Sequence, residues 1–350
     1  MNRWYARLLL TAVLLLGLPY PSPAPLIYVP GEGWRYEPYG SDGKWMMPRA
    51  KDQLEVAQTA FDKRDFKLAI KAAQRTVKMW PLSDYAPEAQ YLLAESYEEL
   101  GKDEKAFREY QIAIEKYPKV KNHQEIIQRQ YDIANKFLAG KWFWKWGFIP
   151  LGSSMDKTVV MYEKIIKNGP YSEVAPQAQI SIGTARDKQK EYAAAVKAYE
   201  RAADRYNDQK DIASEALYKA AMAYYKQAKR AEYDQNAASQ AIATFNDFIT
   251  LYPDDPKIKG AAQLAEGLKT EQARGCFQIA KFYDKRKRYQ GAMIYYNEAQ
   301  AKDPNSSFAI IAKSLIEEIK RILQAKGLNK PAVVSPPEAS ITNQPAPPKP

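Results

Sequence analysis

Cysteine and histidine are almost absent from this chain of 350 residues, which has one of each, Cys276 and His123. One cysteine excludes an intramolecular disulfide, and the two residues together are too few for a Cys/His zinc site. A Cys-His catalytic pair would need both residues, yet they lie far apart along the chain. We expect Cys276 to be a small buried hydrophobe and His123 a solvated linker residue.

Nucleotide-binding motifs are also lacking: we find no P-loop, no GxGxxG element after a strand, and little strand pattern of any kind. The many acidic residues alternate with Lys and Arg at helical spacing, and they form no isolated carboxylate pair suited to acid/base chemistry. The sequence therefore predicts a protein that is not an enzyme and has no cofactor and no metal. An accessory or hydrolytic activity hidden in an insertion is the alternative from another class.

A concentrated basic patch is missing, although the formal net charge is +11. Lys and Arg are interleaved with Asp and Glu, as in EELGKDEKAFREYQIAIEKYPK, which indicates a solvated helical surface. We expect no nucleic acid as partner. Attraction to anionic lipid or to an acidic partner stays open.

The N-terminal stretch has the layout of a secretory signal. Two Arg precede an apolar run from Leu8 to Leu18, and small and helix-breaking residues follow. That run is too short for a helix of about 20 residues that crosses a bilayer. We predict a signal peptide over 1–24 and export to the periplasm, with a buried first helix as the alternative. No cysteine near the signal offers the usual acceptor for N-terminal lipidation.

A repeat of the tetratricopeptide (TPR) type, which is about 34 residues long, runs through the middle of the chain. Between Pro87 and Pro118, small and aromatic residues recur at the spacing of two paired helices, and Gly101 lies in the turn between them. Four clear copies are present, and two more fit if insertions are allowed near 141–155 and 229–237. Because one pair of helices cannot bury its apolar face alone, neighbouring pairs must stack.

The predicted fold class is all-α: a TPR solenoid of about six helical hairpins over 50–326, closed by a C-terminal capping helix. Residues 25–49 are predicted to be an extended aromatic linker that packs along the first repeats. Residues 327–350 are predicted to be a Pro-rich disordered tail.

Repeats end in a recurring phrase: PLSDYA at Pro81, PYSEVA at Pro170 and PNSSFA at Pro304. Proline stops one helix and the serine can cap the next. This phrase resembles the repeats of the BamD-like outer-membrane assembly family. The segment EQARGCFQIAKFYDKRKRYQGAMIYY also matches that family's pattern, at Glu271, Ala280, Tyr283, Lys285, Arg286 and Tyr289.

The resemblance implies a periplasmic scaffold, associated with the outer membrane, that helps assemble and insert outer-membrane β-barrel proteins by binding protein or extended peptide. The chain departs from the family pattern in lacking the lipid-acceptor cysteine and in having about six units where five are usual. A periplasmic repeat scaffold of the Tol-Pal or peptidoglycan-coordination type is the alternative.

In TPR stacks the first helix of each pair forms most of the concave surface, so its non-packing positions are candidate groove residues. In the second repeat these are Glu88, Tyr91, Glu95 and Glu98, and in the last they are Arg274, Phe277, Lys281 and Asp284. Exposed helix positions hold charge in any case, so a plain solvated surface is the other interpretation.

The stretch KWFWKWGFIPLG is an insertion in the third helical hairpin. Read as extended chain, one side carries Trp142, Trp144, Trp146 and Phe148, and the other carries Phe143. Such an apolar face exceeds what soluble monomers usually expose. Three surfaces could bury this apolar face: the chain's own repeats, a partner protein, or a membrane interface. These five aromatic residues are therefore the predicted partner or membrane contact.

Overall fold

The computed structural model describes residues 26–29, 33–36, 45–118, 120–145, 149–230 and 235–325. The chain divides into two compact units, residues 1–185 and 186–350. The predicted signal peptide, the C-terminal tail, Trp146 and Phe148 lie outside the described residues.

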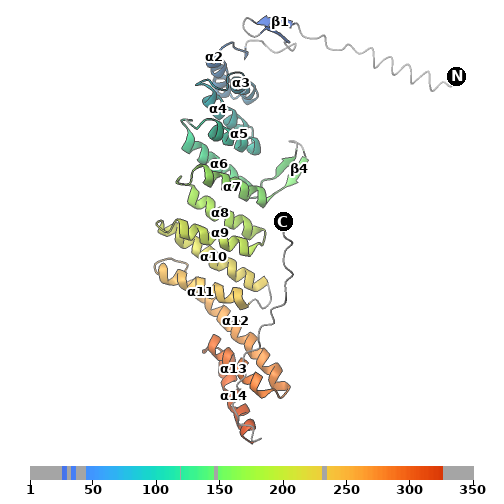
Figure 1. Ribbon diagram of the computed structural model, residues 1–350, viewed down its shortest axis with the longest axis vertical. Helices are drawn as coiled ribbons and strands as arrows, with labels where there is room; N and C mark the ends of the chain where they lie inside the picture. Colours follow the sequence, from blue (N-terminus) through green and yellow to red (C-terminus); the bar gives the residue numbers. More distant parts are fainter. Residues whose placement is uncertain are drawn as a thin grey trace, which may run out of the picture. The chain divides into compact units, whose positions relative to one another are not determined.

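Helices dominate the described residues of both units (Figure 1). In the first unit they are α2 (Ala50–Asp62), α3 (Phe66–Met79), α4 (Ala86–Glu99), α5 (Asp103–Lys116), α6 (His123–Leu138), α7 (Met155–Asn168) and most of α8 (Ala175–Lys188). In the second they are α9 (Tyr192–Arg205), α10 (Lys210–Arg230), α11 (Gln235–Leu251), α12 (Ile258–Lys285), α13 (Tyr289–Lys302) and α14 (Ser307–Ala325). Helices α2 to α7 make three contacting pairs in the first unit, and α10 to α13 make two in the second, where α14 packs on the last pair; this confirms the predicted all-α TPR fold.

Two short antiparallel hairpins accompany the helices, and the sequence had shown little sign of them. Strands β1 (Leu26–Val29) and β2 (Gly33–Tyr36) pair near the N-terminus. Strands β3 (Phe143–Lys145) and β4 (Ile149–Gly152) pair between α6 and α7. The second hairpin is the insertion that interrupts the third helical pair.

Small side chains at the helix contacts allow the helices to pack closely. Ala89, Ala106 and Ala113 are fully buried, and so is the large ring of Tyr110 between them in the chain. Alanine lets two helix backbones approach, and an aromatic ring fills the remaining space. The alternation of small and large residues that defines the repeat in the sequence is thus the packing pattern of the core.

The turn inside a helical pair uses a left-handed residue at an equivalent place in four pairs. Gly101 has φ +67°, while Arg64, Lys190 and Lys287 have φ of 61°, 62° and 57°. In each case the next residue's N–H donates to a carbonyl five residues back, as from Lys102 to Tyr97 at 2.9 Å. Glycine takes this conformation without strain, so three of the four turns hold a strained residue.

The serine of the repeat-ending phrase closes the turn between pairs. The hydroxyls of Ser83, Ser172 and Ser306 each donate to the carbonyl three residues earlier, at 3.0, 2.7 and 2.8 Å. Among these three, Ser306 also has a capping bond in the structure, accepting from the Ala309 N–H at 3.1 Å. The predicted capping role therefore holds at Ser306, while the shared role of the serines is to close the turn.

Helix α12 is long because it serves two cores of the second unit. Its first half places Ala261, Ala265 and Leu268 in a cluster with α10 and α11. Its second half places Cys276 and Phe277 in another cluster with α13 and α14. One continuous helix thus joins two neighbouring layers of the stack.

Candidate functional site

Three of the four groove candidates on α4 meet around one arginine of α6. Arg129 pairs with Glu95 at 2.8 Å, with Glu98 at 3.4 Å and with Glu125 at 3.1 Å. The Arg129 side chain is 30% exposed, and the side chains of Glu95 and Glu98 are about half as exposed. The three carboxylates therefore share one partly buried cation.

Two tyrosines donate hydrogen bonds to these carboxylates. The Tyr91 hydroxyl donates to Glu125 at 2.6 Å and lies 3.2 Å from Glu95, while the Tyr110 hydroxyl donates to Glu98 at 3.0 Å. Burial raises the pKa of Tyr91, so its hydroxyl stays a donor, and that bond is the main cause of the lowered pKa of Glu125. We call Tyr91, Glu95, Glu98, Glu125 and Arg129 the arginine cluster.

Burial of the arginine cluster also acts on Glu95. Desolvation raises the pKa of Glu95, and the neighbouring Arg129 charge opposes that rise. Arg129 and the Tyr91 hydroxyl thus favour the charged form of Glu95 against the effect of burial. The arginine cluster has three carboxylates and one guanidinium, and the Lys136 ammonium lies 3.9 Å from Glu98 at its edge, so its charge balance is still negative.

Glu88 lies outside the arginine cluster and belongs to the preceding contact. It is exposed, and one of its carboxylate oxygens accepts from the Gln58 side-chain amide of α2 at 2.6 Å. Polar pairs therefore link the first helices of three successive repeats, from α2 to α4 and from α4 to α6. These links run along the helices that line the concave face in TPR arrays.

The sequence reasoning missed Arg129 and Glu125, although a signal for them was present. Tyr91 to Glu125 and Glu95 to Arg129 are each separated by 34 residues, as in one TPR repeat. Residues at the same place in consecutive first helices become neighbours when the repeats stack. Comparing candidate positions one repeat apart identifies both pairs.

The groove candidates on α12 are more dispersed. Arg274 pairs with Glu271 at 2.7 Å, and Asp284 accepts from the Tyr296 hydroxyl at 3.3 Å. Lys281 lies over the ring of Phe277, its ammonium 5.9 Å from the ring centre.

Phe277 itself is buried, because its position faces α13 and α14. Its ring packs against Tyr296 and Phe308, with centroids 5.5 and 5.7 Å away. Phe277 is thus a core residue, and it presents no ring to a ligand in the groove.

The aromatic insertion divides its side chains as strand alternation predicts. Phe143 is 2% exposed and stacks on Phe137 of α6 at 4.2 Å, with the Lys157 ammonium 4.7 Å from its ring centre. Trp142 and Trp144 are 55% and 48% exposed. The repeats therefore cover one side of the insertion and leave these two indoles open to solvent.

The base of the β3–β4 hairpin is held by a buried carboxylate at the start of α5. Asp103, whose side chain is 1% exposed, pairs with Lys136 at 3.0 Å and with Lys141. The Trp144 N–H also points to Glu104, with a separation of 3.4 Å. Charge pairing thus fixes Lys141, the residue before Trp142, against the second repeat.

A hollow of about 730 Å³ lies between this hairpin and α5. Its lining includes Trp142, Trp144, Lys102, Lys105 and Arg108. Aromatic and basic side chains thus share one surface of the first unit.

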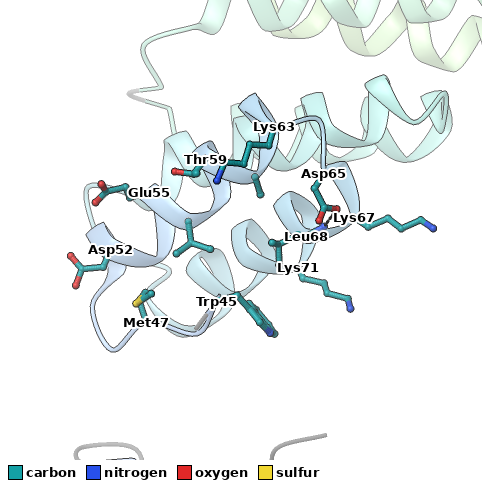
Figure 2. A pocket seen from close by; sticks show the side chains of 12 residues that line it. Trp45, Met47, Asp52, Glu55, Thr59, Lys63, Asp65, Lys67, Leu68 and Lys71 are labelled. Atoms are coloured by element: carbon teal, nitrogen blue, oxygen red, sulfur yellow. Dashed lines mark hydrogen bonds between the residues drawn. The ribbon is translucent and has the colours of Figure 1, made fainter. Parts of the chain in front are cut away.

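A second hollow, of about 750 Å³, opens at the first pair of helices (Figure 2). Trp45 and Met47 line it together with residues of α2 and α3 such as Thr59 and Leu68. Buried Gln53 holds the incoming chain there: its amide donates to the Trp45 carbonyl, and its oxygen accepts from the Met47 N–H, both at 2.9 Å.

Within the described ranges no group of three His, Cys, Asp or Glu side chains is placed to hold a metal ion. Cys276 is buried, and that burial raises the pKa of its thiol. None of the helices that the structure describes combines the length and hydropathy needed to cross a membrane.

Comparison with known families gives two matches. The family described as outer membrane lipoprotein (YfiO) matches residues 153–330, and a tetratricopeptide-repeat family matches residues 54–120. No curated protein matches the chain. The matches show a TPR protein-interaction scaffold.

Solved structures resemble the chain only distantly. The C-terminal part of a TPR repeat-containing protein from Cytophaga hutchinsonii is 16% identical, with a TM-score of 0.35 over 75% of this chain and 87% of that one. A tetratricopeptide repeat protein from Parabacteroides merdae is 14% identical, with a TM-score of 0.33 over 77% and 98%. A MamA fragment from Desulfovibrio magneticus is 15% identical, with a TM-score of 0.31 over 60% and 99%.

Proposed function

The chain belongs to the outer membrane lipoprotein family (YfiO), and from this premise we propose that it is a non-catalytic scaffold of the periplasm. In this role it binds an extended segment of a partner protein and assists the assembly and insertion of outer-membrane β-barrel proteins. Family membership and the repeat-ending phrase support this role.

The observation that carries the proposal is the row of polar side chains on α2, α4 and α6. Exposed Glu88 and the partly exposed carboxylates of the arginine cluster follow one another along the first helices of successive repeats. An extended segment can be held there through its backbone and its side chains. Because carboxylates outnumber cations in the cluster, the surface favours a segment that carries Lys or Arg.

Depletion of the protein in cells tests the cellular role. We expect outer-membrane β-barrel proteins to decrease in the depleted strain and a barrel-assembly protein to co-purify with the chain. Normal amounts of outer-membrane β-barrel proteins after depletion would contradict the proposal. Recovery of cell-wall synthases without any barrel-assembly component would favour the peptidoglycan-coordination alternative.

Photo-crosslinking tests the groove itself. A photoreactive residue in place of Glu88 should capture the partner segment, whereas the same residue in place of Lys164, exposed on the second helix of the third pair, should not. When the photoreactive residue stands at a neighbouring groove position, the charge reversal Glu88→Lys should weaken crosslinking of the partner segment. Equal crosslinking from both positions would contradict binding at the groove.

A further inference from the structure

Two half-exposed indoles lie beside a group of basic side chains in the first unit. Trp142 and Trp144 border the same hollow as Lys102, Lys105 and Arg108. Large aromatic groups that are exposed together mark a surface that another body covers.

The hairpin is built to present these indoles outward. Phe143 lies between them in the chain and stacks on Phe137, while Trp142 and Trp144 on either side of it are about half exposed. Asp103 fixes the approach to the strand through Lys141. Figure 1 shows the hairpin standing out from the helices of its unit.

The solvent-exposed side chains around the indoles carry mostly positive charge. Asp103 is buried and already paired with Lys136 and Lys141, so its charge is neutralised inside. Lys102, Lys105 and Arg108 are exposed, and of these three Arg108 already pairs with Glu109 at 3.0 Å. Glu104 is the only other acidic residue that lines the described part of this hollow.

We propose that the surface formed by Trp142, Trp144, Lys102, Lys105 and Arg108 docks on an anionic lipid bilayer. Indole rings favour the boundary between headgroups and acyl chains. Lys and Arg beside them gain from the negative potential of an anionic leaflet. Contact is peripheral, with Trp142 and Trp144 inserted at the boundary and the three basic residues among the headgroups.

The composition of the surface favours lipid over a protein partner. The centres of protein interfaces are enriched in Trp, Tyr and Arg but depleted in Lys. Here two exposed lysines adjoin the indoles. Docking on lipid is independent of the scaffold role, because it holds whatever segment the groove binds.

Vesicle binding tests the proposal with the full chain as purified from cells, with the same N-terminus in every variant. The protein should co-float with vesicles of phosphatidylglycerol and phosphatidylethanolamine and bind phosphatidylcholine vesicles much more weakly. The variant W142S/W144S should bind at least about tenfold more weakly, because it removes the inserted rings. The variant K102Q/K105Q should lose roughly fivefold for each residue changed.

Matched controls separate docking from folding. Tyr171 is 97% exposed on the turn after α7, so Tyr171→Ser removes an exposed aromatic ring elsewhere in the unit and should leave vesicle binding unchanged. K102Q/K105Q alters only exposed side chains and keeps the fold testable if the tryptophan variant loses helix content. High salt should weaken wild-type binding and have less effect on K102Q/K105Q.

Three outcomes would overturn the proposal. They are the absence of wild-type binding to anionic vesicles, equal binding by the wild type and W142S/W144S, and equal binding to anionic and neutral vesicles. The surface would instead be assigned to a protein partner if W142S/W144S failed to form a crosslink to a protein that the wild type forms, while its vesicle binding was unchanged.

Discussion

Replacing Arg129 by Met removes the guanidinium at the centre of the arginine cluster while keeping most of the side chain's apolar stem, and it leaves the Lys136 ammonium 3.9 Å from Glu98 at the edge. Glu95, Glu98 and Glu125 would then face one another without the guanidinium that now lies 2.8 to 3.4 Å from each. We expect Arg129→Met to destabilise the first unit, because two of these carboxylates have little access to water.

The expected loss in the free energy of unfolding is about 2 kcal/mol. Removing one partner of a fully buried ion pair costs about 3–5 kcal/mol, and exposed pairs contribute about 0–1 kcal/mol. Arg129 is 30% exposed, which places the cluster between these limits. For a unit of this size the melting temperature should fall by about 4–8 °C.

The loss should depend on pH. Burial raises the pKa of Glu95, so its contribution to stability is fully present below the ordinary pKa of glutamate and is lost as the pH rises through the raised value. Without Arg129 that pKa rises further, since the charge that opposes the rise is gone. The deficit of Arg129→Met should therefore be largest at neutral pH and should shrink in acid, as Glu95 takes up a proton.

Denaturant unfolding followed by circular dichroism measures the free energy of unfolding of the wild type and Arg129→Met at several pH values. The double variant E95Q/R129M should regain part of the loss at neutral pH, because it removes a charge that has become unpaired. Lys320→Met, which breaks an exposed pair with Glu317, is the control and should change stability by less than about 0.5 kcal/mol. A loss independent of pH, or no rescue by Glu95→Gln, would refute this account of the arginine cluster.

Three further predictions concern the packing of the repeats. Gly169→Ala should cost about 1–3 kcal/mol in urea unfolding, because a Cβ there would lie 2.4 Å from Ile127 Cδ1. Ile127→Val removes that atom, so combining it with Gly169→Ala should relieve the strain. If the losses in unfolding free energy of the two single variants simply add in the double variant, the clash is contradicted. Gln53→Ala should cost about 1–3 kcal/mol by leaving the backbone groups near Met47 without partners, and an unchanged melting temperature would contradict the clamp. Lys190→Gly should stabilise the second unit by roughly 0.5–1 kcal/mol through relief of a left-handed residue, whereas the opposite change, Gly101→Lys, should destabilise the first, with thermal unfolding as the measurement.

The helical repeat could be predicted from the sequence because its cause is local and periodic. Alanine and tyrosine recur at helical spacing, and proline and glycine mark the ends, so element type and pairing order follow from the chain alone. The turn at Gly101 follows in the same way, since glycine favours a left-handed residue. The equivalent turn at Lys190 carries no such signal, because lysine does not favour a left-handed conformation.

The candidate sites show where such reasoning ends. The alternation in KWFWKWGFIPLG predicted two different sides without saying which of them the repeats cover. The tertiary structure places Phe143 against Phe137 and leaves Trp144 about half exposed. The 34-residue period could have paired Glu95 with Arg129, but only the structure shows that Glu98 shares the same arginine.

By itself the sequence determined the fold class, the number of helical pairs, the place of the insertion and the resemblance to a family of outer-membrane scaffolds. Each of these rests on neighbours in the chain or on a period within it. Only the tertiary structure decided that Arg129 gathers three carboxylates, that Phe277 is covered, and that Trp142 and Trp144 stay exposed. These features depend on how side chains of different helices meet in space, and the packing of the repeats decides which side chains are shared, covered or left exposed.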